Sequence, residues 1–431
     1  MLVKVFDIKK GDVITITGAG GKTSLMFSLA RELSVFGKVL ITTTTKIFLP
    51  KPEEFEVLIT ANNKIKGLSK NIFVYGEKLE NNKLYSPSYD KIYNLKKEFD
   101  YILIEGDGAK EKKIKAWSDT EPCIPSFSTK TIGVINLDIL NLKLEKNNIH
   151  RFEIFKEKFS LYINKIANKY FLKDYIKFGD FFKCSSNTNN YLFFNGIDGD
   201  NYLEKFSQTL EICNQLKKEN CPYNFILGSL YHNYFFKYIP TDAIVMASGY
   251  SKRMGKNKLQ LPYRDTNLLG YTLEKLSFLP FYNIYVCGRE KWVKDLTKNF
   301  GYNYLENKRS QFGQSESIKL GINNSSGEGI VFFTADQPLL TKNTLLKIYF
   351  NFLRYNYITI PRAEGQSFSP VFFPKNKRED LLKLEGDTGG REIIKKTALI
   401  SFVDFQDKKE FLDIDTPEEY QNILSYQIDN K

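Results

Sequence analysis

Two apolar segments, each running directly into a glycine-rich loop, constrain the fold of this chain most strongly. The first is 12–17, followed by Gly18-Ala-Gly-Gly-Lys-Thr-Ser24, and the second is 243–245, followed by the loop 246–258. A strand that opens into a loop of small residues points backbone N–H groups toward an anion, which suits a phosphate group. Each half of the chain therefore predicts an α/β unit with its own phosphate-binding loop.

The second loop also carries cations at useful spacings. It contains Arg253 and Lys258, and Gly249 and Gly255 give its backbone the freedom to turn sharply. An arginine fork and a lysine ammonium both suit the oxygens of a polyphosphate. For this loop taken alone, a surface turn with two solvated cations is the alternative.

Acidic segments further along the chain favour the nucleotide interpretation. The apolar run 329–333 ends near Asp336, and a carboxylate at the carboxyl end of a strand lies where α/β sheets bind ligands. Such a carboxylate typically holds Mg²⁺ against substrate phosphates. Two more acidic loops follow, around Asp387 and Asp415, and Thr416-Pro417 predicts the start of a short helix.

In this order, the motifs resemble the molybdenum-cofactor nucleotidyltransferases, the MobA/MocA-like family, over roughly residues 240–425. The motifs read ASGYSKRMGKNKL, ADQP, GDTGGR and DIDTPEEY. The resemblance implies a Rossmann-like α/β/α nucleotidyltransferase fold and Mg²⁺-dependent transfer of a nucleotidyl group to molybdopterin, with pyrophosphate as the leaving group.

The same resemblance assigns expected roles to individual residues. Catalysis is expected from Arg253, Lys258 and Asp336, and metal binding from Asp336 and Asp415. Asp387 is expected to bind the pterin side or a second metal. The nucleotide would contact the loop residues Ala247, Ser248, Gly249, Ser251 and Gly255.

The base is predicted to be cytosine. The cytidylyltransferase branch reads Ala-Ala-Gly where the guanylyltransferase branch reads Ala-Gly-Gly, and this chain has Ala247-Ser248-Gly249. The Ser248 side chain would add bulk beside the nucleotide, although the Gly-His-Pro of cytidylyltransferases is replaced here by Gln366-Ser-Phe-Ser-Pro370. We therefore expect CTP as the substrate, with GTP as the alternative and a sugar-phosphate nucleotidyltransferase as the alternative enzyme.

The first glycine loop is similar to a shortened P-loop, because Gly18 lies three rather than five positions before Gly21. Lys22 would reach the β and γ phosphates, Thr23 would bind Mg²⁺, and a helix is predicted over 25–36. A structural turn is the alternative. Nucleotide contacts are expected from Lys22, Thr23 and three glycines, Gly18, Gly20 and Gly21.

Other strands of this half also end in polar residues. One runs into Thr42–Thr45, where a plain strand end is the alternative because threonine favours strands. The apolar run 101–104 ends in Glu105 and Asp107, similar to the acidic motif that completes Mg²⁺ binding in P-loop NTPases. A solvated acidic turn is the alternative. Metal binding is predicted for Asp107 together with Thr23, and Glu105 is a further candidate.

This half looks like YqeC, the accessory protein of selenium-dependent molybdenum hydroxylases, over about residues 3–230. The strings are GAGGKTS, ITTTTK, IEGDGAKEKKIKAWSDTEPCIP, IHRFE and FFNGID. The resemblance implies a P-loop NTPase-like domain that binds ATP or GTP and an apo molybdenum hydroxylase as recipient of the cofactor. An NTP hydrolase and a nucleotide-gated cofactor-binding module both remain open. Asn195-Gly-Ile-Asp198 stands where related sequences carry the base-reading motif of GTPases, but it lacks the lysine of that motif. A simple turn after a strand is the alternative interpretation of this segment.

Length and charge set the remaining expectations. The 431 residues predict two domains, 1–235 and 240–431, joined by a linker near 235–242. The net charge of +12 is dispersed among acidic residues without a nucleic-acid-binding module, so no nucleic-acid partner is expected. No run of about 18 apolar residues and no signal peptide are evident, so a cytoplasmic protein without a membrane span is expected.

Cysteine and histidine usage argues against other chemistries. The two histidines, His150 and His232, make a His-rich zinc site and a Ser–His triad unlikely choices for this chain. No C-x-x-C pair is present, which indicates reduced thiols used mostly in packing. The five cysteines are Cys123, Cys184, Cys213, Cys221 and Cys287.

Overall fold

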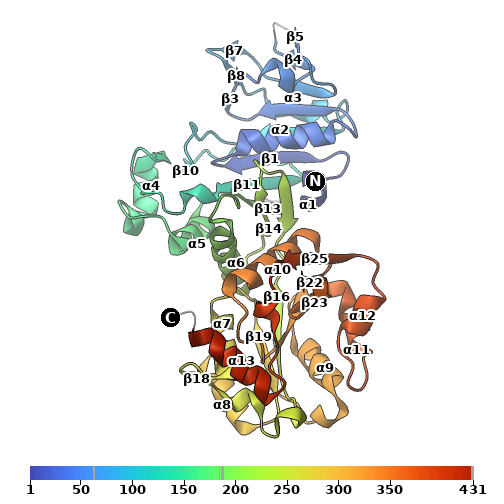
Figure 1. The fold of residues 1–431 in the computed structure, drawn as a ribbon. Coiled ribbons are helices and arrows are strands. Elements are labelled where there is room, and N and C mark those ends of the chain that lie inside the picture. Colours follow the sequence, from blue (N-terminus) through green and yellow to red (C-terminus); the bar gives the residue numbers. More distant parts are fainter. Residues whose placement is uncertain (62–63, 184, 186–188, 429–431) are drawn as a thin grey trace. The chain divides into compact units, whose positions relative to one another are not determined.

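The computed structural model forms two compact units, residues 1–238 and 239–431 (Figure 1). Each unit is built around its own α/β sheet. The expected linker near 235–242 is instead mostly strand, because Tyr234–Lys237 and Thr241–Ala247 each pair into the sheet of their own unit. The structure describes residues 1–431 apart from 62–63, 184, 186–188 and 429–431.

The first unit contains a ten-stranded sheet whose central strands run parallel, with an antiparallel strand at each edge. In order across this sheet, the strands are β15 (Tyr234–Lys237), β14 (Asn224–Ser229), β13 (Asn189–Asn195), β11 (Lys130–Asn136), β1 (Val13–Gly18), β9 (Tyr101–Glu105), β2 (Val39–Thr43), β6 (Ile72–Tyr75), β4 (Val57–Ile59) and β5 (Lys64–Lys66). A small three-stranded sheet joins β3 (Lys46–Phe48), β8 (Lys83–Tyr85) and β7 (Leu79–Glu80). A two-stranded sheet joins β10 (Ile114–Lys115) and β12 (Ile149–His150). The helices are α1 (Leu2–Val5), α2 (Lys22–Leu33), α3 (Tyr89–Leu95), α4 (Phe152–Lys158), α5 (Lys169–Phe178) and α6 (Tyr202–Lys218).

Burial explains why the apolar runs of this unit form parallel strands. β1, β2 and β9 are buried along their whole length, as is typical of parallel strands that are covered on both faces. Ile14 and Ile16 pack in one core cluster with α2, whereas Val13 packs in another with Ile92 of α3. Because β1, β2 and β9 run parallel, the loops that follow them emerge at one edge of the sheet.

The helix after the first glycine loop differs in its bounds from the prediction of 25–36. α2 begins at Lys22 and ends at Leu33. Leu25, Leu29 and Leu33 form its buried stripe, whereas the apolar residues just beyond it, 35–36, are exposed at the surface. The helix therefore starts directly at the glycines, where its first N–H groups are available to a ligand.

The second unit contains an eight-stranded sheet with β16 (Thr241–Ala247) near its centre. The order is β20 (Asn303–Glu306), β19 (Ile284–Gly288), β16, β21 (Gly329–Thr334), β24 (Val371–Pro374), β22 (Ile358–Ala363) and β23 (Gln366–Ser367), and β25 (Ile400–Phe405) also pairs with β22. A small hairpin joins β17 (Pro262–Tyr263) and β18 (Thr266–Asn267). The helices are α7 (Leu268–Ser277), α8 (Lys291–Asn299), α9 (Gln314–Asn324), α10 (Lys342–Tyr355), α11 (Arg378–Leu382), α12 (Arg391–Lys395) and α13 (Pro417–Ile428).

Helices cover both faces of the second sheet. Phe372 and Phe373 are neighbours on β24, so their side chains point to opposite faces. Phe372 stacks on Tyr349 of α10, and Phe373 packs in the cluster that contains Ile318 of α9. This Rossmann-like α/β/α arrangement agrees with the fold expected for this half. Throughout the described residues, no helix has the length and apolar character needed to cross a bilayer.

Candidate functional site

The loop after β16 folds into a short 3₁₀ turn at the end of the sheet. Ser251 and Gly255 flank this turn with left-handed backbones, at φ 49° and 67°. A Cβ on Gly255 would meet open space, so the backbone conformation rather than crowding favours glycine there. Ser251 Oγ accepts a hydrogen bond from the Lys258 backbone N at 3.2 Å. The loop is thereby closed on itself just before Lys258.

Lys258 joins two carboxylates that lie far apart in the sequence. Its Nζ donates to Asp336 Oδ2 and, at 2.8 Å, to Asp415 Oδ1, while Arg253 Nη1 lies 3.0 Å from Asp415 Oδ2. Burial lowers the pKa of Lys258, but Asp336 and Asp415 outweigh that effect and leave the pKa above its ordinary value. Burial likewise opposes ionisation of Asp415, yet Lys258 and Arg253 hold its pKa below the usual range. Lys258 and Asp415 are therefore both charged at neutral pH.

These residues line an open cleft of about 730 Å³ at the carboxyl end of β16 and β21. Ala247 and Gly255 do not line it: Ala247 is the buried last residue of β16, and Gly255 ends the 3₁₀ turn. One wall, the segment 310–314, was missed in the sequence because it carries no charged residue or motif. The expected residues that the cleft brings together are Ser248, Gly249, Ser251, Arg253, Lys258, Asp336, Asp387 and Asp415.

Ser248 lines the cleft, but its hydroxyl is engaged by the sheet. Its Oγ donates to the Cys287 carbonyl on β19 at 2.8 Å, and the residue is only 5% exposed. The hydroxyl is therefore directed into the sheet, and the discrimination against a purine expected from the bulk of this side chain stays a prediction. Its hydrogen bond fixes the start of the loop against β19.

Asp387 supports another wall of the cleft. Its Oδ1 accepts a hydrogen bond from the Gln314 backbone N at 3.3 Å, at the first residue of α9. Gly313 lies so close to this loop that a Cβ on it would come within 2.3 Å of the Gly386 backbone. Asp387 therefore holds the GDTGG loop against the N-terminus of α9.

The carboxylates fit a divalent cation bound together with a substrate. Asp336 Oδ1 is buried and lacks a hydrogen-bond partner among the described residues, and Asp415 faces the same ammonium as Asp336. Carboxylate oxygens of this kind suit Mg²⁺, which usually takes one or two protein carboxylates and completes its shell with water and phosphate. Within the described ranges, no group of three or more His, Cys, Asp or Glu side chains is arranged to hold a metal by itself. Phosphate oxygens would therefore have to complete the shell.

A lysine outside the cleft holds the Asp336 loop in place. Lys275 of α7 donates to three backbone carbonyls just after Asp336, those of Gln337, Pro338 and Leu340, at 3.2, 2.8 and 3.0 Å. The Ile414 backbone N donates to the Asp336 carbonyl at 3.1 Å, which ties the same loop to the acidic segment before α13. Nothing in the sequence near Lys275 marked this role.

Replacing Lys275 with methionine is expected to lower kcat for nucleotidyl transfer several-fold, with a smaller effect on the KM for nucleotide. Burial lowers the pKa of Lys275 to about 7. The substitution removes the donor to three carbonyls, and the loop is destabilised by about 1–2 kcal/mol. Steady-state kinetics and thermal unfolding of the full chain measure both effects. Lys347→Met, at an exposed position on α10, is the matched control. Equal kcat in the two variants would contradict the positioning role.

The first glycine loop packs tightly against neighbouring strands. Gly18, Gly20 and Gly21 have φ of 94°, 77° and 136°, a range that strongly favours glycine. A Cβ on Gly18 would lie 2.4 Å from the Val134 carbonyl oxygen, and one on Gly20 would lie 2.4 Å from Asn136 Cβ. The glycines therefore allow a loop that no larger residue could form against β11.

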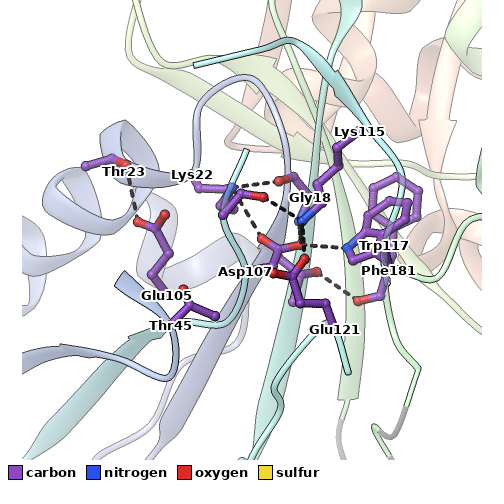
Figure 2. A network of polar contacts seen from close by, with 12 residues as sticks. Gly18, Lys22, Thr23, Thr45, Glu105, Asp107, Lys115, Trp117, Glu121 and Phe181 are labelled. Atoms are coloured by element: carbon purple, nitrogen blue, oxygen red, sulfur yellow. Dashed lines mark hydrogen bonds and ion pairs between the residues drawn. The ribbon is translucent and has the colours of Figure 1, made fainter. Parts of the chain in front are cut away.

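Lys22 turns back toward the strand that precedes it. Its Nζ donates to the Gly18 carbonyl at 2.7 Å and lies 3.3 Å from Asp107 Oδ1 (Figure 2). The other oxygen of Asp107 accepts from the Gly18 N at 3.0 Å and from Trp117 Nε1 at 2.6 Å. Burial raises the pKa of Asp107, but Lys22 and Lys115 outweigh it and keep the pKa below the usual range. Asp107 is therefore an internal anion that holds the glycine loop.

The metal role predicted for Asp107 stays a prediction, and Glu105 lies closer to the cleft than Asp107 does. The Asp107 carboxylate is fully buried, does not line the cleft beside the loop, and already faces two ammonium groups. Glu105 is better placed, because it lines that cleft and its Oε2 accepts from Thr23 Oγ1 at 3.3 Å. Burial raises the pKa of Glu105. Thr23 and Glu105 are thus the two candidate metal ligands of this unit that line the cleft.

The ionic network extends from Asp107 through Lys115 to Glu121 (Figure 2). Lys115 is fully buried, with its Nζ 2.9 Å from Asp107 Oδ2 and 3.1 Å from Glu121 Oε2. Glu121 Oε1 in turn accepts from Arg151 Nη2 at 2.6 Å. Trp117 is also buried, with the Lys115 ammonium 5.3 Å from the centre of its ring. The glycine loop and Arg151 are thus linked through continuous charged contacts.

The remaining polar strand ends support the loops. Thr43 and Thr44 donate to the carbonyls of Glu105 and Cys123, at 3.1 and 2.6 Å, which supports the strand-end alternative for both. Asn195 Oδ1 accepts from the Leu230 N at 3.0 Å, and its Nδ2 donates to the Gly20 carbonyl at 3.5 Å. Asn195 therefore braces the glycine loop, in agreement with the turn alternative rather than base reading.

The cysteines and histidines add little chemistry. The described cysteines are free thiols, and Cys184 lies outside the described residues. His232 is exposed, as expected for a surface residue. His150 lines the cleft of the first unit, and burial together with Lys115, Arg151 and other nearby cations lowers its pKa to about 4. It is therefore neutral at physiological pH.

Comparison with known proteins divides the chain in the same way. The YqeC protein model matches residues 14–153, and the MobA-like NTP transferase domain model matches residues 243–400. The uncharacterized protein YqeC of Escherichia coli is 35% identical over 156 residues, which cover 35% of this chain and 61% of that protein. The chain thus spans about three fifths of this relative's length.

Two further relatives match the second half. The purine catabolism protein PucB of Bacillus subtilis is 26% identical over 196 residues, covering 42% of this chain and 94% of that protein. The molybdenum cofactor guanylyltransferase of Campylobacter jejuni (serotype O:6) is 26% identical over 189 residues, covering 43% of this chain and 95% of that protein. These matches and the cleft at the end of β16 and β21 lead to one assignment: the chain joins a YqeC region to a MobA-like NTP transferase domain.

Proposed function

We propose that this protein transfers a nucleotidyl group, CMP from CTP, to the phosphate of molybdopterin or its molybdenum form and releases pyrophosphate. The observation that carries the proposal is the cluster of Arg253, Lys258, Asp336 and Asp415 in the cleft of the NTP transferase domain. The name of the Campylobacter jejuni relative, a molybdenum cofactor guanylyltransferase, supports a molybdopterin acceptor. Incubation with molybdopterin and each labelled nucleotide, followed by assay of pyrophosphate and dinucleotide product, tests it.

The residues suit a direct displacement at phosphorus. An ionised oxygen of the acceptor phosphate would attack the α-phosphorus, and the bond from this phosphorus to the oxygen bridging to the β-phosphate would break. Both electrons of that bond leave with pyrophosphate, so no protein nucleophile or proton transfer is needed. Arg253 and Lys258 would exchange their carboxylate contacts for phosphate oxygens and offset the charge that develops there. Mg²⁺ bound by Asp336 and Asp415 would supply further neutralisation of the phosphates.

The choice of base is tested by nucleotide competition. We expect kcat/KM to be at least about tenfold higher for CTP than for GTP, because hydrogen bonds to a base edge discriminate steeply. The side chains available to read the base are the amides of Gln311 and Gln314 in the cleft wall. Since Ser248 points into the sheet, Ser248→Gly should lower activity with both nucleotides without changing their ratio. A higher kcat/KM for GTP would overturn the CTP assignment.

For the first unit, we propose nucleotide binding at the glycine loop, with ATP or GTP as the ligand. Lys22, Thr23 and Glu105 line its cleft, and the first turn of α2 opens toward it. This unit would act in maturation of a molybdenum hydroxylase that receives the finished cofactor, as a hydrolase or as a nucleotide-gated binding module. Steady-state NTP hydrolysis by the full chain, compared with its Lys22→Ala variant, separates these two forms.

A further inference from the structure

The cleft of the first unit is lined by more cations than carboxylates, and some of these cations lie away from the glycine loop in the sequence. Its volume is about 900 Å³. Three carboxylates line it, of which Glu105 contacts Thr23 and Glu121 contacts Lys115 and Arg151. Six cationic side chains line it, namely Lys22, Lys46, Lys83, Lys110, Lys112 and Arg151.

Several of these cations have no anionic partner among the residues that the structure describes. Lys46, Lys83 and Lys110 form no ion pair with any residue that the structure describes. Arg151 contacts Glu121 through Nη2, and 28% of its side chain remains exposed where it lines the cleft.

Three residues that line one wall of this cleft have strained backbone conformations. Lys110, Glu111 and Arg151 all have left-handed backbones, at φ 47°, 62° and 60°. The Lys112 N donates to the Ala109 carbonyl at 3.0 Å, which closes a tight turn with two non-glycine residues at its corners. Such conformations cost free energy and tend to occur at ligand-binding sites. β10 and β12 pair directly behind this turn and Arg151, which holds the two segments together.

We propose that this wall is a second binding site, for a tetrahedral oxyanion such as phosphate or a phosphate monoester, built from Lys110 and Arg151. The inference rests on the proposed nucleotide site at the glycine loop, which the second ligand would adjoin. The exposed part of the Arg151 guanidinium could donate to an oxyanion oxygen while Nη2 stays on Glu121. The unit would then bring a nucleotide and a phosphorylated second substrate together in one cleft.

A buried tryptophan makes the site measurable in the full chain. Arg151, Glu121, Lys115 and Trp117 are connected in series by contacts of 2.6 Å, 3.1 Å and a cation–ring distance of 5.3 Å. An oxyanion that binds Arg151 would change the charge distribution beside the indole of Trp117. The chain has two tryptophans, and the other, Trp292, lies in the second unit. A Trp292→Phe background therefore confines the signal to the first unit.

The test is titration of inorganic phosphate, followed by Trp117 fluorescence, in the presence of a saturating non-hydrolysable ATP analogue. Equilibrium dialysis of labelled phosphate gives a second readout that does not depend on fluorescence. We expect phosphate to bind without displacing the analogue, and Lys110→Gln to raise its Kd at least about tenfold. Arg151→Lys, which keeps the charge but loses the fork, should also weaken binding. Lys146→Gln, at an exposed position outside this cleft, should have no effect.

Two results would overturn the oxyanion-site inference, and a third would separate it from the proposed nucleotide site. Displacement of the analogue by phosphate would mean that the two share one site. Phosphate binding by dialysis that is the same in the parent, Lys110→Gln and Arg151→Lys proteins would also rule out this wall. Failure of the analogue to bind, with phosphate binding still dependent on Lys110, would instead remove the nucleotide assignment and leave the oxyanion site standing.

Discussion

Replacing Asp336 with asparagine should lower kcat for nucleotidyl transfer by about a hundredfold or more. The substitution keeps the size of the side chain but removes the charge that pairs with Lys258 and would bind Mg²⁺. Loss of a metal ligand costs several kcal/mol of transition-state stabilisation, and each 1.4 kcal/mol is about a factor of ten in rate. Pyrophosphate release with molybdopterin and CTP at saturating Mg²⁺ measures the effect.

The expected loss is specific to the cleft. Asp336 is buried at the end of β21, so circular dichroism and thermal unfolding must show that the variant retains its fold. Asp295→Asn, at an exposed position on α8, is the matched control and should keep the parent rate. If the Asp336 variant folds and releases pyrophosphate at the control rate, Asp336 has no metal or charge role.

Replacing Lys22 with alanine should weaken nucleotide binding by the first unit roughly ten- to hundredfold. A charge-assisted hydrogen bond contributes about 1.5–3 kcal/mol, and the first turn of α2 provides no second ammonium to compensate. Asp107 keeps Lys115, Trp117 and the Gly18 N as partners, so the loop should stay folded. Energy transfer from Trp117 to a fluorescent ATP analogue, in the Trp292→Phe background, measures binding at this unit.

A matched variant separates charge at the loop from general helix effects. Arg31→Ala removes an exposed cation from the last turn of α2 and should leave the Kd unchanged. Transfer of a nucleotidyl group by the second unit should also persist in Lys22→Ala, because its proposed site uses none of these residues. An unchanged Kd in the folded Lys22 variant would exclude the glycine loop as the phosphate site.

The sequence predicted the local elements of both units well, for physical reasons that are themselves local. Apolar runs such as 101–104 and 329–333 became buried strands, because only strands covered on both faces are apolar at every position. Thr416 accepts a hydrogen bond from the Glu419 N at 3.3 Å at the start of α13, as the Thr-Pro signal predicted. Motif residues at strand ends reached one cleft because parallel strands end at the same edge of a sheet.

What the sequence could not determine depends on which groups meet across the fold. Asp107 and Glu105 both follow β9, but only the tertiary structure buries Asp107 between two lysines and leaves Glu105 in the cleft. The same holds for Ser248, whose hydroxyl finds a carbonyl on a neighbouring strand. Lys275 contacts carbonyls more than sixty residues away in the chain. Motifs thus predicted where the two clefts form, whereas the partner of each polar group depended on long-range packing, because a buried polar group binds whichever neighbour the fold supplies.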